Sequence, residues 1–250
     1  MPPRNFSWLR RLVLALAILF AVTVLGFWLA RERYENRLRQ QIWPSDAPKI
    51  SIVSNSVTNT ARTVLLLGDS RIAQWGLPEL AHWHVVNAGI GGLTTGQILL
   101  CTPKLLEEFH PNTVVLQAGI NDLKFLGLRP EMISTIVSLA MSNLMAIVSE
   151  CTKRDCKIIV LETWPAGEPS MARRLVWSAA IPVSVNQLNA QLRALNSPEQ
   201  GIRVIDLFSE AGLKPGIELY HDTLHFTTEA YERLTPALKK TLDEASPSAK

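Results

Sequence analysis

The sequence has few cysteines and little net charge, and both shortages exclude classes of protein. Its three cysteines, Cys101, Cys151 and Cys156, are too few and too oddly numbered for a disulfide framework. The sequence contains no pair of C-x-x-C elements, so a structural zinc site is not expected. A net charge of +3 without a clustered basic face does not indicate a nucleic-acid partner. We expect free thiols; Cys151 and Cys156 could form a disulfide only if the domain is exported.

Signs of disorder and of internal repeats are also missing. Hydrophobic residues make up 47% of the chain and charged residues 19%, which is ordinary for a folded protein. The chain has 250 residues, at the upper end of what one α/β domain usually occupies. We therefore expect one domain with additional segments; nothing in the sequence indicates its oligomeric state.

Charged residues are absent from one long N-terminal segment, residues 12–30. A helix of this length, at about 1.5 Å per residue, just spans a hydrocarbon core of about 30 Å. A cleaved secretory signal has an apolar region of only about 7–15 residues and small residues before its cleavage site. Phe27, Trp28 and Leu29 stand at that position here. The pattern favours an uncleaved single-pass anchor over a cleaved signal or a buried soluble helix.

The segments around the anchor give the expected organisation of the chain. Arginines flank both ends of the anchor in similar numbers, so the positive-inside rule does not fix its orientation. A short N-terminus before a large domain is the usual signal-anchor layout, which predicts an exported domain on the periplasmic or extracellular face. The expected parts are a tail, a transmembrane anchor, a proline- and serine-containing linker and a folded domain, over residues 1–11, 12–30, 31–60 and 61–250 respectively.

Short apolar runs alternate with helical stretches throughout the folded domain. The expected strands are residues 63–67, 84–87, 113–117, 157–161 and 202–205, and the expected helices are 95–108, 130–153, 183–196 and 228–243. Such alternation indicates βαβ units and a parallel sheet covered on both faces. We predict a three-layer α/β/α sandwich with a five-stranded parallel sheet. Ligands of such sheets bind outside the carboxyl ends of the strands.

Polar or glycine-rich motifs follow three successive predicted strands. Gly-Asp-Ser, ending at Ser70, follows the first strand. A serine at a strand-to-helix turn presents its hydroxyl at the rim of the sheet. The alternative is that this serine only caps the helix. Residues 87–92, Asn-Ala-Gly-Ile-Gly-Gly, follow the second and leave backbone N–H groups free for an anion. Gly-Ile-Asn-Asp at 119–122 follows the third, where the Asn121 amide could stabilise an oxyanion or form an Asx turn.

A fourth motif, Asp222-x-x-His225, stands just before the last predicted helix. An aspartate three residues before a histidine can orient the imidazole and stabilise its protonated form, as in a catalytic triad. His221 and His225 could instead form part of a metal site. No further Cys/His/Glu cluster joins them, so no metal is expected. The fold predicts that all four motifs meet at one rim of the sheet.

With these four motifs the sequence resembles the SGNH/GDSL hydrolase family, whose members have a flavodoxin-like fold. The resemblance implies that Ser70 is the nucleophile, His225 its base, and Asp222 the acid that orients the base. It also implies an oxyanion hole formed by the backbone N–H groups of Ser70 and Gly92 and the side chain of Asn121. The mechanism of the family needs no cofactor.

The resemblance predicts a membrane-anchored serine ester hydrolase that acts through an acyl-enzyme on Ser70. Two substrate classes compete: O-acetyl groups on a carbohydrate or cell-envelope substrate, which we favour, and lipid esters or acyl thioesters, as in a lysophospholipase or thioesterase. The first would use an open groove lined with aromatic residues and the second an apolar acyl channel. The same fold would also suit an acyltransferase or a non-catalytic binding module.

Two further features near the motifs have open interpretations. Arg71 directly follows the proposed nucleophile, and we interpret it as a solvated charge in preference to a substrate-binding group. Residues 163–182, after the fourth predicted strand, carry Trp164 and Trp177. This stretch either overhangs the site and shapes its specificity or contributes aromatic side chains to the packing.

Overall fold

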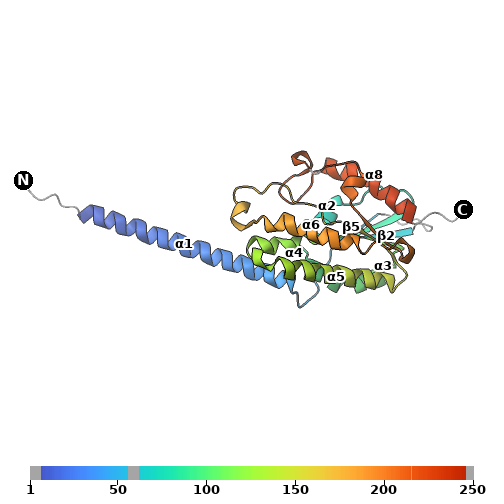
Figure 1. Cartoon of the computed structure of the whole chain (residues 1–250), viewed down its shortest axis with the longest axis horizontal. Coiled ribbons are helices and arrows are strands. Elements are labelled where there is room, and N and C mark those ends of the chain that lie inside the picture. Colours follow the sequence, from blue (N-terminus) through green and yellow to red (C-terminus); the bar gives the residue numbers. More distant parts are fainter. Residues whose placement is uncertain (1–6, 56–61, 215, 246–250) are drawn as a thin grey trace, which may run out of the picture. The chain divides into compact units, whose positions relative to one another are not determined.

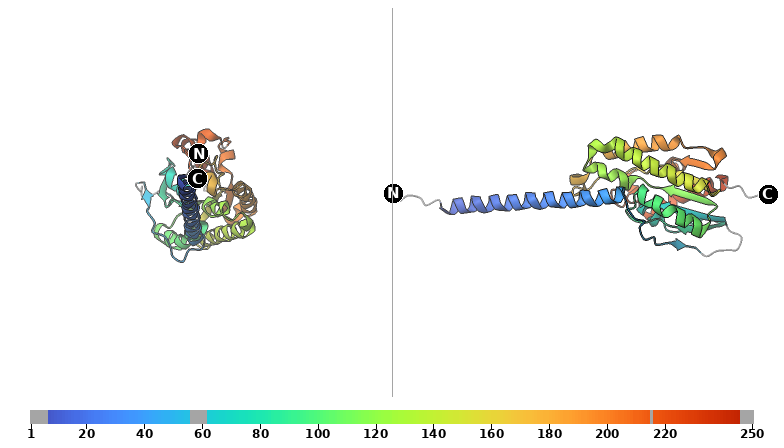
Figure 2. Two further views of the ribbon diagram at one scale, coloured as in Figure 1. Left: turned by 90° about the vertical axis from the view of Figure 1, so that its left-hand side faces the viewer. Right: turned by 90° about the horizontal axis from the view of Figure 1, so that it is seen from below.

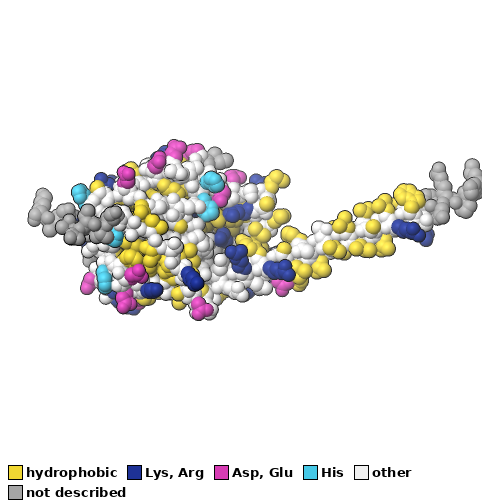
Figure 3. Space-filling model, turned by 180° about the vertical axis from the view of Figure 1, so that it is seen from behind, with side chains coloured by type: hydrophobic (Ala, Val, Ile, Leu, Met, Phe, Trp, Pro, Cys, Tyr) yellow, Lys and Arg dark blue, Asp and Glu magenta, His cyan; other side chains and the backbone are white. Residues whose placement is uncertain are grey.

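The computed structural model describes residues 7–55, 62–214 and 216–245, and it divides into two compact units, Met1–Gln40 and Gln41–Lys250. The first unit is dominated by helix α1, Ser7–Ile42, which continues past the predicted anchor into the predicted linker. Its most apolar stretch is entirely exposed and long enough to cross a membrane, although a signal sequence would meet the same criteria. Figure 3 shows its apolar surface bounded by basic side chains near both ends.

The second unit contains a six-stranded sheet with the strand order β1-β3-β2-β4-β5-β6. The strands are β1 Val53–Ser54, β2 Arg62–Gly68, β3 Trp83–Asn87, β4 Thr113–Gln117, β5 Lys157–Leu161 and β6 Ile202–Ile205. The five predicted strands are present and parallel, which confirms the predicted fold class. The sixth, β1, pairs antiparallel with β3 at the edge and was not predicted, because two residues are too few for a recognisable alternation.

The central strands are buried on both faces, as their apolar runs predict. Every residue from Val64 to Leu67 in β2 is buried, and so are all five residues of β4. A strand covered by helices on both sides needs apolar side chains in both directions, so continuous runs replace the alternation of a half-exposed strand. Each fully buried aliphatic side chain stabilises the fold by roughly 1.5–3 kcal/mol relative to exposure.

Two helical layers cover the sheet (Figures 1 and 2). On one face α5 packs between α3 and α6, while α2, α7 and α8 share the apolar core of the other. The helices of this unit are α2 Ser70–Trp75, α3 Thr95–Phe109, α4 Ile120–Leu123, α5 Ile133–Thr152, α6 Ala180–Arg193, α7 Leu207–Glu210 and α8 Thr228–Ala245. Short 3-10 segments, η1 to η5, cover Lys124–Gly127, Pro130–Met132, Arg173–Val176, Pro198–Gln200 and Ile217–Leu219.

Helix α5 is a second stretch apolar enough to cross a membrane, counted from Pro130 to Thr152. Its position explains that composition without a bilayer, because it lies between two other helices on the sheet. Its inward side chains, Ile136, Val137, Ala140, Leu144 and Ile147, are all buried. We therefore assign α5 to the core of the domain.

The register of the parallel strands brings their carboxyl ends to one edge. Leu66 of β2 is paired with Asn87 of β3, and Gly68 of β2 with Gln117 of β4. The segments that follow these three strands therefore start side by side. This edge carries the four motifs found in the sequence.

Candidate functional site

Ser70 stands at the first position of α2, directly after β2. Asp69 caps this helix, because its Oδ1 accepts a hydrogen bond from the Arg71 N–H at 2.9 Å. A side chain at Gly68 would meet the Gln117 carbonyl oxygen at 2.2 Å, so only glycine allows the strand to end this close to β4. The first N–H groups of a helix have no partner within it, which leaves the Ser70 N–H available to a ligand.

A continuous hydrogen-bond chain joins Ser70 to the loop before α8. The His225 Nε2 lies 3.0 Å from the Ser70 Oγ, and the His225 Nδ1 lies 2.8 Å from an Asp222 carboxylate oxygen. The other carboxylate oxygen of Asp222 accepts from the backbone N–H groups of Leu224 at 2.7 Å and His225 at 2.9 Å. Residues that are 155 positions apart in sequence thus form one serine–histidine–aspartate array.

The electrostatics of Asp222 favour its ionised form. Partial burial alone would raise the pKa of Asp222, but the hydrogen bonds from the His225 ring and from the Leu224 and His225 N–H groups outweigh it and lower the pKa to about 2. The carboxylate is then an acceptor at neutral pH, so it holds the His225 Nδ1 as the protonated nitrogen. The other ring nitrogen, Nε2, is left to accept a proton from the Ser70 hydroxyl.

The glycine-rich turn after β3 passes close to Ser70. A Cβ added to Gly91 would lie 4.0 Å from the Ser70 Cβ, and Gly92 has a φ of +82°, a conformation that favours glycine. Asn87 fixes the start of this turn, because its amide donates to the Ile72 carbonyl at 2.8 Å and its Oδ1 accepts from the Gly89 N–H at 2.8 Å. The asparagine of this motif is therefore structural, a role that the sequence did not reveal.

Asn121 is buried in α4 and is tied to the same turn. Its amide nitrogen donates one hydrogen bond to the Leu93 carbonyl at 2.9 Å, directly after Gly92. The neighbouring Asp122 accepts from the Thr95 N–H at 3.0 Å and the Thr95 hydroxyl at 2.7 Å. Complete burial raises the pKa of Asp122 to about 6 despite these bonds. These contacts join the segments after β3 and β4.

Arg71 is fully buried, so its interpretation as a solvated charge is wrong. Its guanidinium donates to three carbonyl groups: Leu224 at 2.8 Å, Trp164 at 2.5 Å and Pro165 at 2.8 Å. The guanidinium carbon also lies 5.1 Å from the centre of the Phe226 ring. Arg71 thereby connects the nucleophile helix to the Asp222–His225 loop and to the loop after β5.

An open cleft of about 1380 Å³ lies beside the array, with Asp222 on its wall. Trp177 lines the cleft, whereas Trp164 is buried among Trp75, Phe208 and Phe226. Of the two tryptophans of the 163–182 stretch, Trp177 therefore lies at the cleft and Trp164 contributes to the packing. The remaining lining comes mainly from residues 165–170, Arg173, Arg174, Tyr220 and His221.

The structure brings the predicted site residues to one edge. His225 contacts both Ser70 and Asp222, and Gly92 and Asn121 lie on the two segments that flank Ser70. Across the part of the chain that the structure describes, no three His, Cys, Asp or Glu side chains gather in a way that could hold a metal ion. The arrangement contains the parts of a nucleophile activated by a histidine.

Comparisons with known proteins identify the family of this chain. Residues 56–233 match the GDSL-like Lipase/Acylhydrolase family, a match that covers most of the chain. The chain therefore belongs to this family of carboxylic ester hydrolases, as the sequence motifs predicted. An arylesterase of Vibrio mimicus is 25% identical over 123 aligned residues, and the match covers 43% of this chain and 58% of that protein. The chain thus matches just over half the length of this curated relative.

Several solved structures share the fold. A carbohydrate acetylesterase family member from Sinorhizobium meliloti is 18% identical with a TM-score of 0.58, covering 74% of this chain and 98% of its own. The aryl esterase of M. smegmatis is 17% identical with a TM-score of 0.56, covering 74% of this chain and all of its own. A lipase/acylhydrolase from Enterococcus faecalis is 23% identical with a TM-score of 0.52, covering 76% of this chain and all of its own. At these identities the likeness concerns the fold.

Proposed function

We propose that this protein is a serine ester hydrolase that removes O-acetyl groups from a carbohydrate or cell-envelope substrate. The observation that carries the proposal is the unbroken chain of hydrogen bonds from Asp222 through His225 to Ser70, at 2.8 and 3.0 Å. It lies at the carboxyl edge of a parallel sheet, where such folds bind ligands. An adjacent base and an orienting acid are what a serine hydroxyl needs to act as a nucleophile.

The reaction proceeds in two halves. The His225 Nε2 takes the proton of the Ser70 hydroxyl as the oxygen attacks the ester carbonyl, and the Asp222 carboxylate stabilises the imidazolium. The alcohol leaves with that proton, and the acyl group stays on Ser70. Water then attacks the acyl-enzyme while His225 takes its proton, acetate is released, and the serine hydroxyl is restored.

The negative charge that develops on the carbonyl oxygen needs donors fixed in advance. The Ser70 N–H at the start of α2 and the Gly92 N–H of the glycine turn supply two. The Asn121 amide supplies a third, because only one of its two hydrogens is used by the Leu93 carbonyl. A donor of this kind contributes roughly 3–4 kcal/mol to transition-state stabilisation.

The shape of the cleft supports a carbohydrate substrate. Its volume of about 1380 Å³ greatly exceeds the space that an acetyl group needs, so most of it serves the alcohol part of the ester. Trp177 and Tyr220 offer aromatic surface, and Glu168, Ser170 and His221 offer polar groups. An open groove of this kind suits a chain of sugars, whereas a long acyl chain would need a closed apolar channel. The relationship in fold to a carbohydrate acetylesterase points the same way.

The N-terminal helix completes the proposal. We assign α1 as an uncleaved anchor, because its apolar stretch is as long as a bilayer is thick and lacks charge. A catalytic domain on the exported side of the membrane would meet the proposed substrate there. The anchored enzyme would then act on envelope or exported polysaccharide.

The decisive test compares p-nitrophenyl acetate with p-nitrophenyl octanoate, using the purified full-length protein in detergent. We expect acetate to be preferred, and Ser70→Ala to lower kcat by about 10⁴-fold or more. Ser209→Ala is the matched control, since the Ser209 hydroxyl also donates a hydrogen bond, to Asp206 at 2.7 Å, but among the described residues it forms none with the array. Full turnover by Ser70→Ala would refute the assignment, and a preference for octanoate would favour a lipid ester as the substrate.

A further inference from the structure

One loop of the catalytic unit carries unusually exposed apolar side chains. Among residues 41–245 as the structure describes them, Met171 at 88% and Leu175 at 66% are the most exposed large apolar side chains. Both belong to the loop between β5 and α6, around the 3-10 turn Arg173–Val176. Exposed apolar patches beside polar residues mark surfaces that interact with a protein or a membrane, and these two side chains stand four residues apart.

Two arginines stand between these apolar residues. Neither Arg173 nor Arg174 forms an ion pair with a carboxylate in the described part of the chain. The Arg174 Nε donates to the Pro169 carbonyl at 3.3 Å, and the Arg173 guanidinium lies 5.9 Å from the Trp177 ring centre. One terminal nitrogen of Arg173 is buried and has no hydrogen-bond acceptor among the described residues. Arg174 is exposed and Arg173 half-buried, so both charges are open to an external anion, except at the buried nitrogen of Arg173.

Other arginines of the same unit contrast with this pair. Arg154 binds Glu150 at 2.6 Å, Arg193 binds Glu162 at 2.6 Å, and Arg203 binds Glu244 at 3.1 Å. These three guanidinium groups have a carboxylate partner, and within the same described ranges the two on the exposed loop lack one. Arginine forms bidentate hydrogen bonds with phosphate as readily as with carboxylate.

The combination of apolar and basic side chains fits a lipid surface. Segments that lie in a membrane interface place apolar groups at the boundary of headgroups and acyl chains and basic groups against anionic phosphates. A bilayer would also lie near the catalytic unit, because α1 has the length and composition of a membrane anchor. Tethering makes such a contact effectively intramolecular, so a weak surface affinity is sufficient.

We propose that the loop over residues 169–177 docks on an anionic lipid bilayer. Met171 and Leu175 enter the interface, and Arg173 and Arg174 bind headgroup phosphates. The loop also forms a wall of the cleft that Asp222 lines. Docking therefore places the mouth of the cleft at the membrane surface, and the esters that reach Ser70 are those presented there. The docking itself does not depend on the chemistry proposed for the site.

The test places a fluorescent label on the loop of the full-length protein. Cys101, Cys151 and Cys156 are buried, so an environment-sensitive maleimide dye will react selectively with the new thiol of Met171→Cys. Met145→Cys on α5 is the matched control, since Met145 is also exposed, at 50%, but lies on a helix and outside the basic loop. Both proteins are reconstituted in phosphatidylcholine vesicles with and without about a third of phosphatidylglycerol, and background labelling is measured on the parent protein.

We expect the label at position 171 to shift to the blue and to be quenched at least twofold by spin-labelled lipid in the anionic vesicles. The label at position 145 should behave as in water. Arg173→Gln with Arg174→Gln should remove most of the difference between anionic and neutral vesicles. A water-like label at position 171, or one that does not respond to phosphatidylglycerol, overturns the proposal. A shift that grows with protein density at constant lipid composition indicates contact between protein copies and overturns it as well.

Discussion

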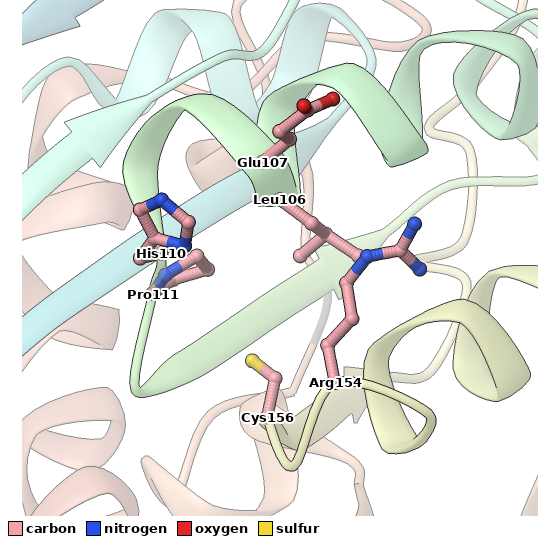
Figure 4. A pocket seen from close by; sticks show the side chains of 6 residues that line it. All are labelled: Leu106, Glu107, His110, Pro111, Arg154 and Cys156. Atoms are coloured by element: carbon pink, nitrogen blue, oxygen red, sulfur yellow. The ribbon is translucent and has the colours of Figure 1, made fainter.

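The two ends of the sheet offer similar side chains and differ in how these are arranged. The carboxyl end carries Ser70, His225 and Asp222 beside the large cleft. The amino end has a hollow of about 470 Å³ whose lining includes Glu107, His110, Arg154 and Cys156 (Figure 4). Each end therefore contains an acid, a histidine and a side chain that can act as a nucleophile. Residue types alone would not distinguish them.

Contacts between the side chains do distinguish the two ends. At the carboxyl end every polar group of the array is within 3.0 Å of the next. At the amino end the side chains of Glu107, His110 and Arg154 point away from one another around the hollow. A hydrogen bond between the thiols lowers the pKa of Cys156 and raises that of Cys151, and both sulfurs are buried. A nucleophile without an aligned base does not make a catalytic site.

After Ser70→Ala, the largest effect is expected for the proposed oxyanion donor at the carboxyl end. We expect Asn121→Ala to lower kcat for p-nitrophenyl acetate by about 10²-fold or more, because a fixed donor is lost in the transition state. Asn143→Ala is the control, since the Asn143 amide is partly buried and likewise donates a hydrogen bond, to the Thr95 hydroxyl at 3.0 Å. Melting temperatures of both variants separate catalysis from stability. An unchanged kcat in Asn121→Ala would assign the third donor to another group.

The motifs at this end could be predicted from sequence because of a general property of parallel sheets. Parallel strands can be located from their short apolar runs, and their carboxyl ends share one edge of the sheet. The residues after β2, β3 and β4 were therefore expected to meet there, and the structure brings them together. β1 gave no signal, because two residues cannot display a period. The role of Arg71 was also hidden, since its partners are 93 to 153 positions away and only packing reveals them.

The second prediction tests whether Arg71 holds the carboxyl end together. Arg71→Lys keeps the charge but cannot reach three carbonyl groups at once. At least one buried carbonyl then loses its donor, which costs roughly 1–3 kcal/mol of unfolding free energy. Because the Leu224 carbonyl is adjacent to His225, we also expect kcat to fall by about tenfold, as misplacement of catalytic groups does. Kinetics well below the melting temperature will measure this.

The control for Arg71 is another arginine on the same unit. Arg193 forms its ion pair with Glu162 from a mostly exposed position. Lysine keeps the positive charge beside the buried Glu162 carboxylate, so Arg193→Lys should lose one of the two hydrogen bonds, roughly 0.5–1.5 kcal/mol, and leave kcat nearly unchanged. Equal losses in the two variants would mean that Arg71 has no special link to the array.

The third prediction concerns Asp122, whose pKa burial raises to about 6 from the usual 3.8. Between these two pH values the unfolded chain has already released this proton and the folded protein still holds it, so unfolding free energy falls as pH rises. The full difference, on the order of 3 kcal/mol, is reached above pH 6. Asp122→Asn should therefore gain stability relative to the parent protein on going from pH 4 to pH 8, measured by urea unfolding. A constant difference across this range would contradict the raised pKa.

The smallest effect is expected at the amino end of the sheet. His110→Ala and Cys156→Ser should leave ester turnover within about twofold of the parent protein, because neither side chain contacts the array at the other end. Cys156→Ser removes the thiol pair with Cys151, so we expect a slightly lower melting temperature. That decrease would confirm that the substitution perturbs its own surroundings. A tenfold loss of kcat in either variant would mean that the two ends are coupled. In that case the side chains at the amino end would contribute to ester turnover from a distance, and the two ends would not differ in function.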